Sequence, residues 1–219
     1  MRRLKLFWDS NVGKKVVMGA TGIVMVLFVM QHVVGVFRIY QSASAINDYA
    51  NFLKSKPLLV WPARLFLLAC VVLHAVAALQ LRNRSRAARP IDYEAYEPQV
   101  STFASRTIRW GGVLLLVFIV FHILHLTTGT LFPQDFRAED VAGNVIRGFN
   151  IWWVSAFYIV SMLALGLHLY HGLWSSPRSL GVPYPRARLR RQVAYVLAIV
   201  VAGGFIAVPL GVLAGILKL

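Results

Sequence analysis

Cysteine and acidic side chains are scarce in this chain. Cys70 is the only cysteine among 219 residues, which excludes an intrachain disulfide, a zinc site made of thiolates and an iron–sulfur cluster held by this chain alone. We expect Cys70 to be small apolar filler. Only 14% of the residues are charged and 58% are hydrophobic, so the apolar runs are too long for the core of one soluble domain. The composition predicts a membrane protein.

Five uncharged runs set the number of membrane spans. They cover residues 16–37, 65–81, 110–131, 151–174 and 193–217. An α-helix needs about 20 residues to cross about 30 Å of hydrocarbon, and residues 58–62 extend the shortest run past Arg64, whose guanidinium would reach the interface. The first run starts too late and is too uniformly apolar for a cleaved signal, so we expect it to be retained.

We therefore predict an all-α protein: an integral membrane bundle of five transmembrane helices, forming one domain over residues 1–219. The expected spans are about 15–38, 58–81, 107–131, 150–175 and 192–217. Between the first two spans, residues 45–53 are expected to form a short interfacial helix. Residues 135–149 are expected to form a loop, in which a short helix is possible.

The distribution of basic residues predicts the orientation. Of the 23 Lys and Arg residues, five lie in residues 1–15, six in 82–109 and five in 178–191, all on one side of a five-span chain. Seven remain on the other side, so the positive-inside rule places the N-terminus in the cytoplasm and the C-terminus outside. The net charge of +15 is then mainly a topology signal, which argues against a nucleic-acid partner, although some inner basic residues could hold anionic lipid.

Four histidines lie inside four different spans. His74 and His168 precede the inner-boundary residues Arg82 and Arg178 by eight and ten positions, so both should lie roughly 12–15 Å from the cytoplasmic boundary. His32 and His122 should both lie about 10 Å from the outer boundary. Because a titratable side chain is costly in hydrocarbon, the four histidines predict a functional site with two pairs, one at each level.

Two imidazoles that face each other across a bundle are suited to hold a haem iron from both sides. The inner haem would lie between His74 and His168, and the outer haem between His32 and His122. No Cys-x-x-Cys-His is present, which excludes thioether attachment and predicts two b-type haems. The alternative is that each histidine bonds only to a carbonyl of a neighbouring helix.

Several other residues are candidates for secondary roles. His125 and His171 each lie one turn from a proposed ligand, and spacing alone does not choose the ligand within either doublet. Either could bond a haem propionate, and His125 could contact a quinone. Arginines near the boundaries are candidates to bond propionates, and we expect most of them to serve only the topology. These are Arg82, Arg106, Arg109 and Arg178 inside and Arg38 outside.

Four segments in order resemble a known family. They are Gln31-His32, residues 73–76 (Leu-His-Ala-Val), Arg109 followed thirteen residues later by His122, and residues 168–174 (His-Leu-Tyr-His-Gly-Leu-Trp). Together they resemble the cytochrome b subunit of succinate dehydrogenases and fumarate reductases, in its single-anchor, five-helix, di-haem form. The resemblance covers the first four spans and their loops.

The resemblance implies His168 rather than His171, and His122 rather than His125, as iron ligands. It also implies a pairing of span one with three and of two with four. It further implies a flavoprotein and an iron–sulfur partner that oxidise succinate on the cytoplasmic side of a prokaryotic inner membrane. Electrons then pass through the inner and outer haems to a membrane quinone, with menaquinone favoured. Some members carry a glutamate two residues before the span-four ligand, implicated in proton movement. That position is Gly166 here, and no predicted span contains an acidic residue.

Some assignments stay open from sequence. The inner loops are too short to fold into a flavin-binding domain, so electrons must arrive from another polypeptide, and residues 86–97 are a candidate docking segment or a solvated loop. No catalytic residue and no quinone-binding residue is assigned. Two alternatives are a di-haem cytochrome b anchor of another quinone-linked complex (hydrogenase, formate dehydrogenase or nitrate reductase) and a haem-free multispan transporter.

Overall fold

The structure is a computed structural model that describes residues 2–88, 102–181 and 187–219. Within these ranges all regular secondary structure is helical. The candidate docking segment at residues 86–97 lies largely outside the described residues.

Among the described residues, five helices are long and apolar enough to cross a membrane, as predicted. They carry exposed apolar side chains along their length, such as Leu27, Leu68, Val117, Leu163 and Ile199, each more than half exposed, as expected for lipid contact. The five helices are α2 (Asn11–Val36), α4 (Pro57–Ala87), α5 (Phe103–His122), α7 (Trp152–Ser179) and α8 (Ala187–Leu213).

Several helices begin or end at other residues than the predicted spans, and capping side chains set the starts of two of them. Helix α2 begins after Ser10, whose side chain accepts a hydrogen bond from the Gly13 N–H, and α5 begins with a reciprocal capping box between Thr102 and Ser105. Helix α4 starts at Pro57 and continues past residue 81 to Ala87, because basic residues extend a helix readily once it has left the hydrocarbon.

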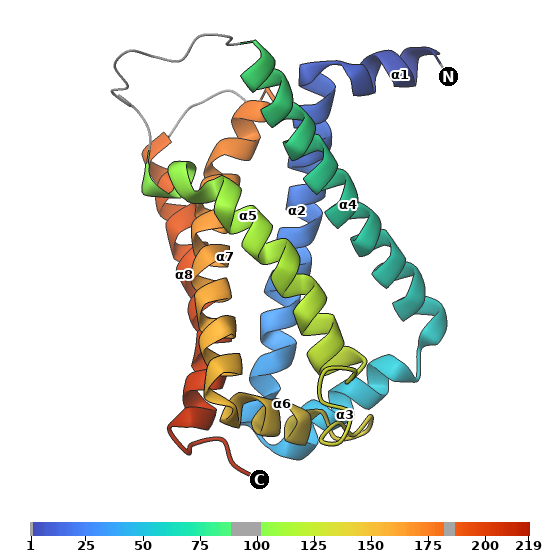
Figure 1. Ribbon diagram of the computed structural model, residues 1–219, viewed down its shortest axis with the longest axis vertical. Coiled ribbons are helices and arrows are strands. Elements are labelled where there is room, and N and C mark those ends of the chain that lie inside the picture. Colours follow the sequence, from blue (N-terminus) through green and yellow to red (C-terminus); the bar gives the residue numbers. More distant parts are fainter. Residues whose placement is uncertain (1, 89–101, 182–186) are drawn as a thin grey trace.

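A peripheral and a central group of helices make up the bundle. Helices α2, α7 and α8 form the centre, in which α7 packs against both α2 and α8. Helix α4 packs on α2, and α5 packs on α7. In the described parts of these helices, α4 is not closely packed on α7, nor α5 on α2. Figure 1 shows α4 and α5 leaning to the same side, both inclined to α2, α7 and α8.

The two chain ends lie at opposite ends of the bundle, as five spans require (Figure 1). We call these the N-terminal end and the C-terminal end. At the N-terminal end, α1 (Arg2–Asp9) runs across the bundle axis, and Lys14 is 1% exposed, with its ammonium donating to the Trp8 carbonyl oxygen. Arg84 of α4 donates to the Asp9 carbonyl oxygen and to Asn11 Oδ1, which fixes α4 to this corner.

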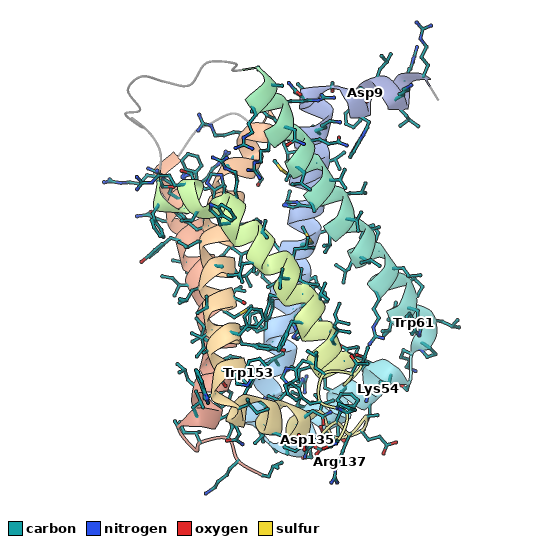
Figure 2. The ribbon with its side chains drawn as sticks, viewed as in Figure 1. Asp9, Lys54, Trp61, Asp135, Arg137 and Trp153 are labelled. Atoms are coloured by element: carbon teal, nitrogen blue, oxygen red, sulfur yellow. The ribbon has the colours of Figure 1, made fainter. Side chains whose placement is uncertain are left out.

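Two short helices cover the C-terminal end. They are α3 (Ala43–Lys54) and α6 (Val141–Asn150), preceded by the 3-10 turn η1 (Phe37–Tyr40), so the helices expected near residues 45–53 and within 135–149 are confirmed. Figure 2 shows Lys54, Asp135 and Arg137 gathered at this end, opposite Asp9, with Trp61 and Trp153 nearby, as tryptophans at a membrane boundary are.

Polar side chains hold this cover together. Asp140 caps α6 by accepting from the Gly143 N–H at 2.9 Å, and it pairs with Arg147 at 3.3 Å. The Gly143 N–H bond, supported by Asn47 and Arg147, lowers the pKa of Asp140, so this carboxylate stays charged to a lower pH than an ordinary aspartate does. Lys54 also donates to the Ala138 carbonyl oxygen. The cover is thereby linked from α3 to α6.

Candidate haem-binding sites

The four predicted histidines meet in the two predicted pairs. The rings of His74 (α4) and His168 (α7) have centres 6.0 Å apart, and those of His32 (α2) and His122 (α5) have centres 5.9 Å apart. His122 ends α5 and His32 lies four residues before the end of α2, so their pair is nearer the C-terminal end. We call His74 with His168 the N-side pair and His32 with His122 the C-side pair.

The ring separations suit a shared metal. An imidazole nitrogen binds a first-row metal at about 2 Å and the ring centre lies roughly 1 Å further, so two rings on opposite sides of one iron have centres about 6 Å apart. Both pairs match this separation, with ring planes inclined at 55° in the N-side pair and 78° in the C-side pair.

The hydrogen bonds of the rings favour one nitrogen for a metal. His74 Nδ1 lies 3.0 Å from the Met18 carbonyl oxygen, so this nitrogen donates and Nε2 keeps its lone pair. The Thr21 hydroxyl lies near the same Nδ1, at 3.4 Å. His122 Nδ1 lies 3.3 Å from the Tyr158 hydroxyl, and where Nδ1 donates to this hydroxyl Nε2 is available to a metal. His168 Nδ1 is buried with no hydrogen-bond partner among the described residues.

Space beside the pairs follows from the helix packing. The N-side pair connects α4 to α7, and the C-side pair connects α5 to α2. In neither case do the two helices pack closely on each other, so their backbones stand apart at the pair. All four rings are only half-buried. A cavity of about 350 Å³ adjoins His168, with Gly111 of α5 and Ala164 of α7 in its walls, and a volume of that size is within the range of ligand sites.

Gly22 lies against one ring of the N-side pair. A Cβ on Gly22 would lie 3.4 Å from Cε1 of His74, whereas a Cβ on Gly112 would meet nothing within 4 Å. A Cβ on Gly19 would instead meet Leu180 at 3.4 Å. Gly22 therefore keeps room for the His74 ring, while Gly19 serves the packing of α2. The donor chemistry, ring separations and open space fit a bis-imidazole haem at each pair.

The secondary candidates have separate positions. His125 lies in the π-helical turn η2 (Ile123–Thr127), is 4% exposed, and bonds to Tyr158. His171 is half-buried one turn beyond His168 and outside the ring pair. Arg178 lies over the Trp174 ring at 5.5 Å, and Arg38 lies over the Tyr49 ring at 5.0 Å.

The remaining arginines stay candidates for propionate contacts. Arg82 Nε is buried with no partner among the described residues, and it lies on α4 eight residues beyond His74. Arg106 and Arg109 lie in the first two turns of α5. A buried guanidinium nitrogen without a partner favours Arg82 as the strongest of the inner candidates.

Tyr158 is the residue that the sequence prediction missed. It is 5% exposed and contacts both His122 and His125 through its hydroxyl. A signal for it existed, because a tyrosine deep inside an apolar span needs a partner for its hydroxyl, and the histidines of the neighbouring span are the natural partners.

Comparison of the chain with models of protein families, with curated proteins and with solved structures gave no match.

Proposed function

We propose that this chain is the di-haem b membrane anchor of a succinate:quinone oxidoreductase. The observation that supports the haems is the meeting of four histidines as two cross-helix ring pairs, 5.9 and 6.0 Å apart, at two levels of a membrane bundle. The resemblance of the histidine-bearing segments to succinate dehydrogenase cytochrome b supports the substrate.

The proposed orientation puts the N-terminal end in the cytoplasm of a prokaryotic cell, because sixteen of the 23 basic residues flank the spans on that side. The N-side pair is then the inner site and the C-side pair the outer site. The two sites divide the thickness of the membrane between them, as a path for electrons from one face towards the other requires.

Each residue has a defined task in this proposal. His74 and His168 would hold the inner iron, and His32 and His122 the outer iron. The Met18 carbonyl oxygen orients the His74 ring and fixes its tautomer. A haem iron held by two imidazoles carries one electron by changing between Fe(II) and Fe(III).

Partners complete the reaction. A flavoprotein and an iron–sulfur protein on the cytoplasmic side would oxidise succinate, and a membrane quinone, with menaquinone favoured, would receive the electrons near the outer site. The described residues form only membrane helices and their short caps, so succinate chemistry is assigned to the partners.

The deciding experiment is a dithionite-reduced minus oxidised spectrum of the purified chain, with the haem-to-protein ratio. We expect a b-type α-band and two haems per chain. His74→Ala and His32→Ala should each lose one haem, whereas the matched control His171→Ala should keep both. Absence of the α-band, or equal loss in the control, would refute haem binding at these pairs.

A second measurement tests the partners. The chain isolated from its own membrane should bring with it a flavoprotein and an iron–sulfur protein that reduce its haems when succinate is added. Reduction by hydrogen or formate in place of succinate would assign the haems to a different quinone-linked complex.

A further inference from the structure

One buried hydroxyl joins two histidines near the C-terminal end. Tyr158 Oη lies 3.3 Å from His122 Nδ1 and 3.0 Å from His125 Nδ1. Tyr158 and His125 are 5% and 4% exposed, so no bulk water competes for these bonds.

The number of hydrogens fixes the direction of the two bonds. If His122 keeps its Nε2 lone pair for a metal, its proton is on Nδ1, and Nδ1–H donates to the Tyr158 oxygen. The single hydrogen of the Tyr158 hydroxyl then donates to His125 Nδ1 at 3.0 Å. The proton of His125 is left on Nε2, so the three groups form one continuous chain of donors and acceptors.

Packing holds the chain in place. The Tyr158 ring makes edge contacts with Phe118 and Phe149, with ring centres 5.0 and 4.8 Å away. On the far side, His125 lies directly against the backbone of Gly148, where an added Cβ would come within 2.6 Å of its Cε1. These contacts pack both rings around the shared hydroxyl.

The position of His125 depends on the π-turn. Helix α5 changes from α-helical to π-helical geometry immediately after His122, and His125 lies in the middle of the widened turn. Such turns occur often at functional sites. In this geometry both Nδ1 atoms face the same hydroxyl.

We propose that Tyr158 and His125 are positioning residues for the outer iron ligand and that they lower the reduction potential of the outer haem. This rests on the proposed function, because it assigns His122 to an iron. An acceptor at Nδ1–H makes an imidazole a stronger donor to its metal, which favours the higher oxidation state. Tyr158 is itself a better acceptor because its own hydrogen is drawn to His125.

The experiment is a redox titration of the α-bands in Tyr158→Phe, His125→Leu and the control Tyr170→Phe. Tyr170 lies on the same helix, in contact with Tyr195 and away from both hydroxyl bonds. Tyr158→Phe keeps the ring and removes the acceptor. At a fixed potential we expect it to raise the Fe(II) to Fe(III) ratio of the outer haem alone by about threefold or more. His125→Leu should shift the ratio in the same direction by less, and Tyr170→Phe should not shift it.

Electron paramagnetic resonance of the oxidised haems gives a second measurement that a purely structural role would not move. We expect the signal of one haem to change in Tyr158→Phe while the other keeps its wild-type position. Two bound haems with unchanged potentials and signals in Tyr158→Phe would overturn the positioning role and leave the proposed function intact. A wild-type chain without haem would overturn the proposed function itself. If Tyr158→Phe does not fold, the His125→Leu titration decides.

Discussion

The two histidine pairs differ in what holds their rings. At the N-side pair, His74 donates to a main-chain carbonyl oxygen, that of Met18. At the C-side pair, His122 bonds to the side-chain hydroxyl of Tyr158. A main-chain carbonyl stays in place whatever side chain replaces residue 18, whereas a hydroxyl is lost by one substitution. A single substitution at Tyr158 can therefore change the hydrogen bonding of the C-side pair, whereas a substitution at Met18 leaves that of the N-side pair in place.

The surroundings differ as well. At the N-side pair, a cavity of about 350 Å³ adjoins His168, and Gly22 lies against the ring of His74. The C-side pair is surrounded by aromatic rings, with Phe28 and Phe205 each 5.5 Å from His32 and Phe118 5.7 Å from His122, between ring centres. A substitution that fills space should therefore disturb the N-side pair. A substitution that shifts a packed aromatic ring should disturb the C-side pair.

Gly148→Ala should produce the largest change, confined to the C-side pair. Its Cβ would collide with the His125 ring, and relief requires a shift of α6 or loss of the Tyr158 bond. Overpacking of this kind costs about 1–3 kcal/mol, so thermal unfolding should begin several degrees lower. Under the proposed function, the outer haem should be lost first. Gly203→Ala, where an added Cβ meets nothing within 4 Å, is the matched control. Equal haem content in both variants would contradict the close packing.

Gly22→Leu should produce an intermediate change, confined to the N-side pair. An alanine would fit, because its Cβ would lie 3.4 Å from His74 Cε1, but the outer carbons of leucine would displace the ring. We expect the variant to lose the inner haem and keep the outer one, measured as a haem-to-protein ratio with the potentials of the remaining haem. Gly203→Leu serves as the control for a bulky side chain in a span, and loss of both haems in Gly22→Leu would indicate general misfolding.

Thr21→Val should produce the smallest change and would sharpen the comparison. The valine removes a hydroxyl 3.4 Å from His74 Nδ1 but leaves the Met18 carbonyl oxygen at 3.0 Å. The inner potential should therefore move less than the outer potential moves in Tyr158→Phe, when both are titrated in the same buffer. A larger movement in Thr21→Val would show that the main chain does not dominate at the N-side pair.

The fold could be predicted from the sequence to the level of helix number and span position, since long uncharged runs have few alternatives in a membrane. The ends of the helices could not. The third span was expected to reach residue 131, but the helical turns end at Thr127 and Gly129 follows with a φ of +69°, a backbone conformation that favours glycine. The fifth span was expected to reach residue 217, but α8 ends at Leu213.

The pairing of the histidines was predictable because the depth of a residue in the membrane follows from helix rise. Two histidines share each of two depths, so only one arrangement into pairs is possible. The supporting residues were not predictable in this way. Whether Met18 or Tyr158 faces a given ring depends on the rotation of each helix about its own axis, which tertiary packing sets. The π-turn that places His125 is likewise invisible in the spacing, because it is a local change of helical winding.

Each histidine pair connects a peripheral helix to a central one, and this has a consequence for biogenesis. A cofactor bound by both rings would stabilise the docking of α4 or α5. The gain is about 2.7 kcal/mol when the free cofactor concentration is a hundred times its Kd. If the two pairs hold haem as proposed, the quantity of this chain in the membrane would then follow the cell's haem supply.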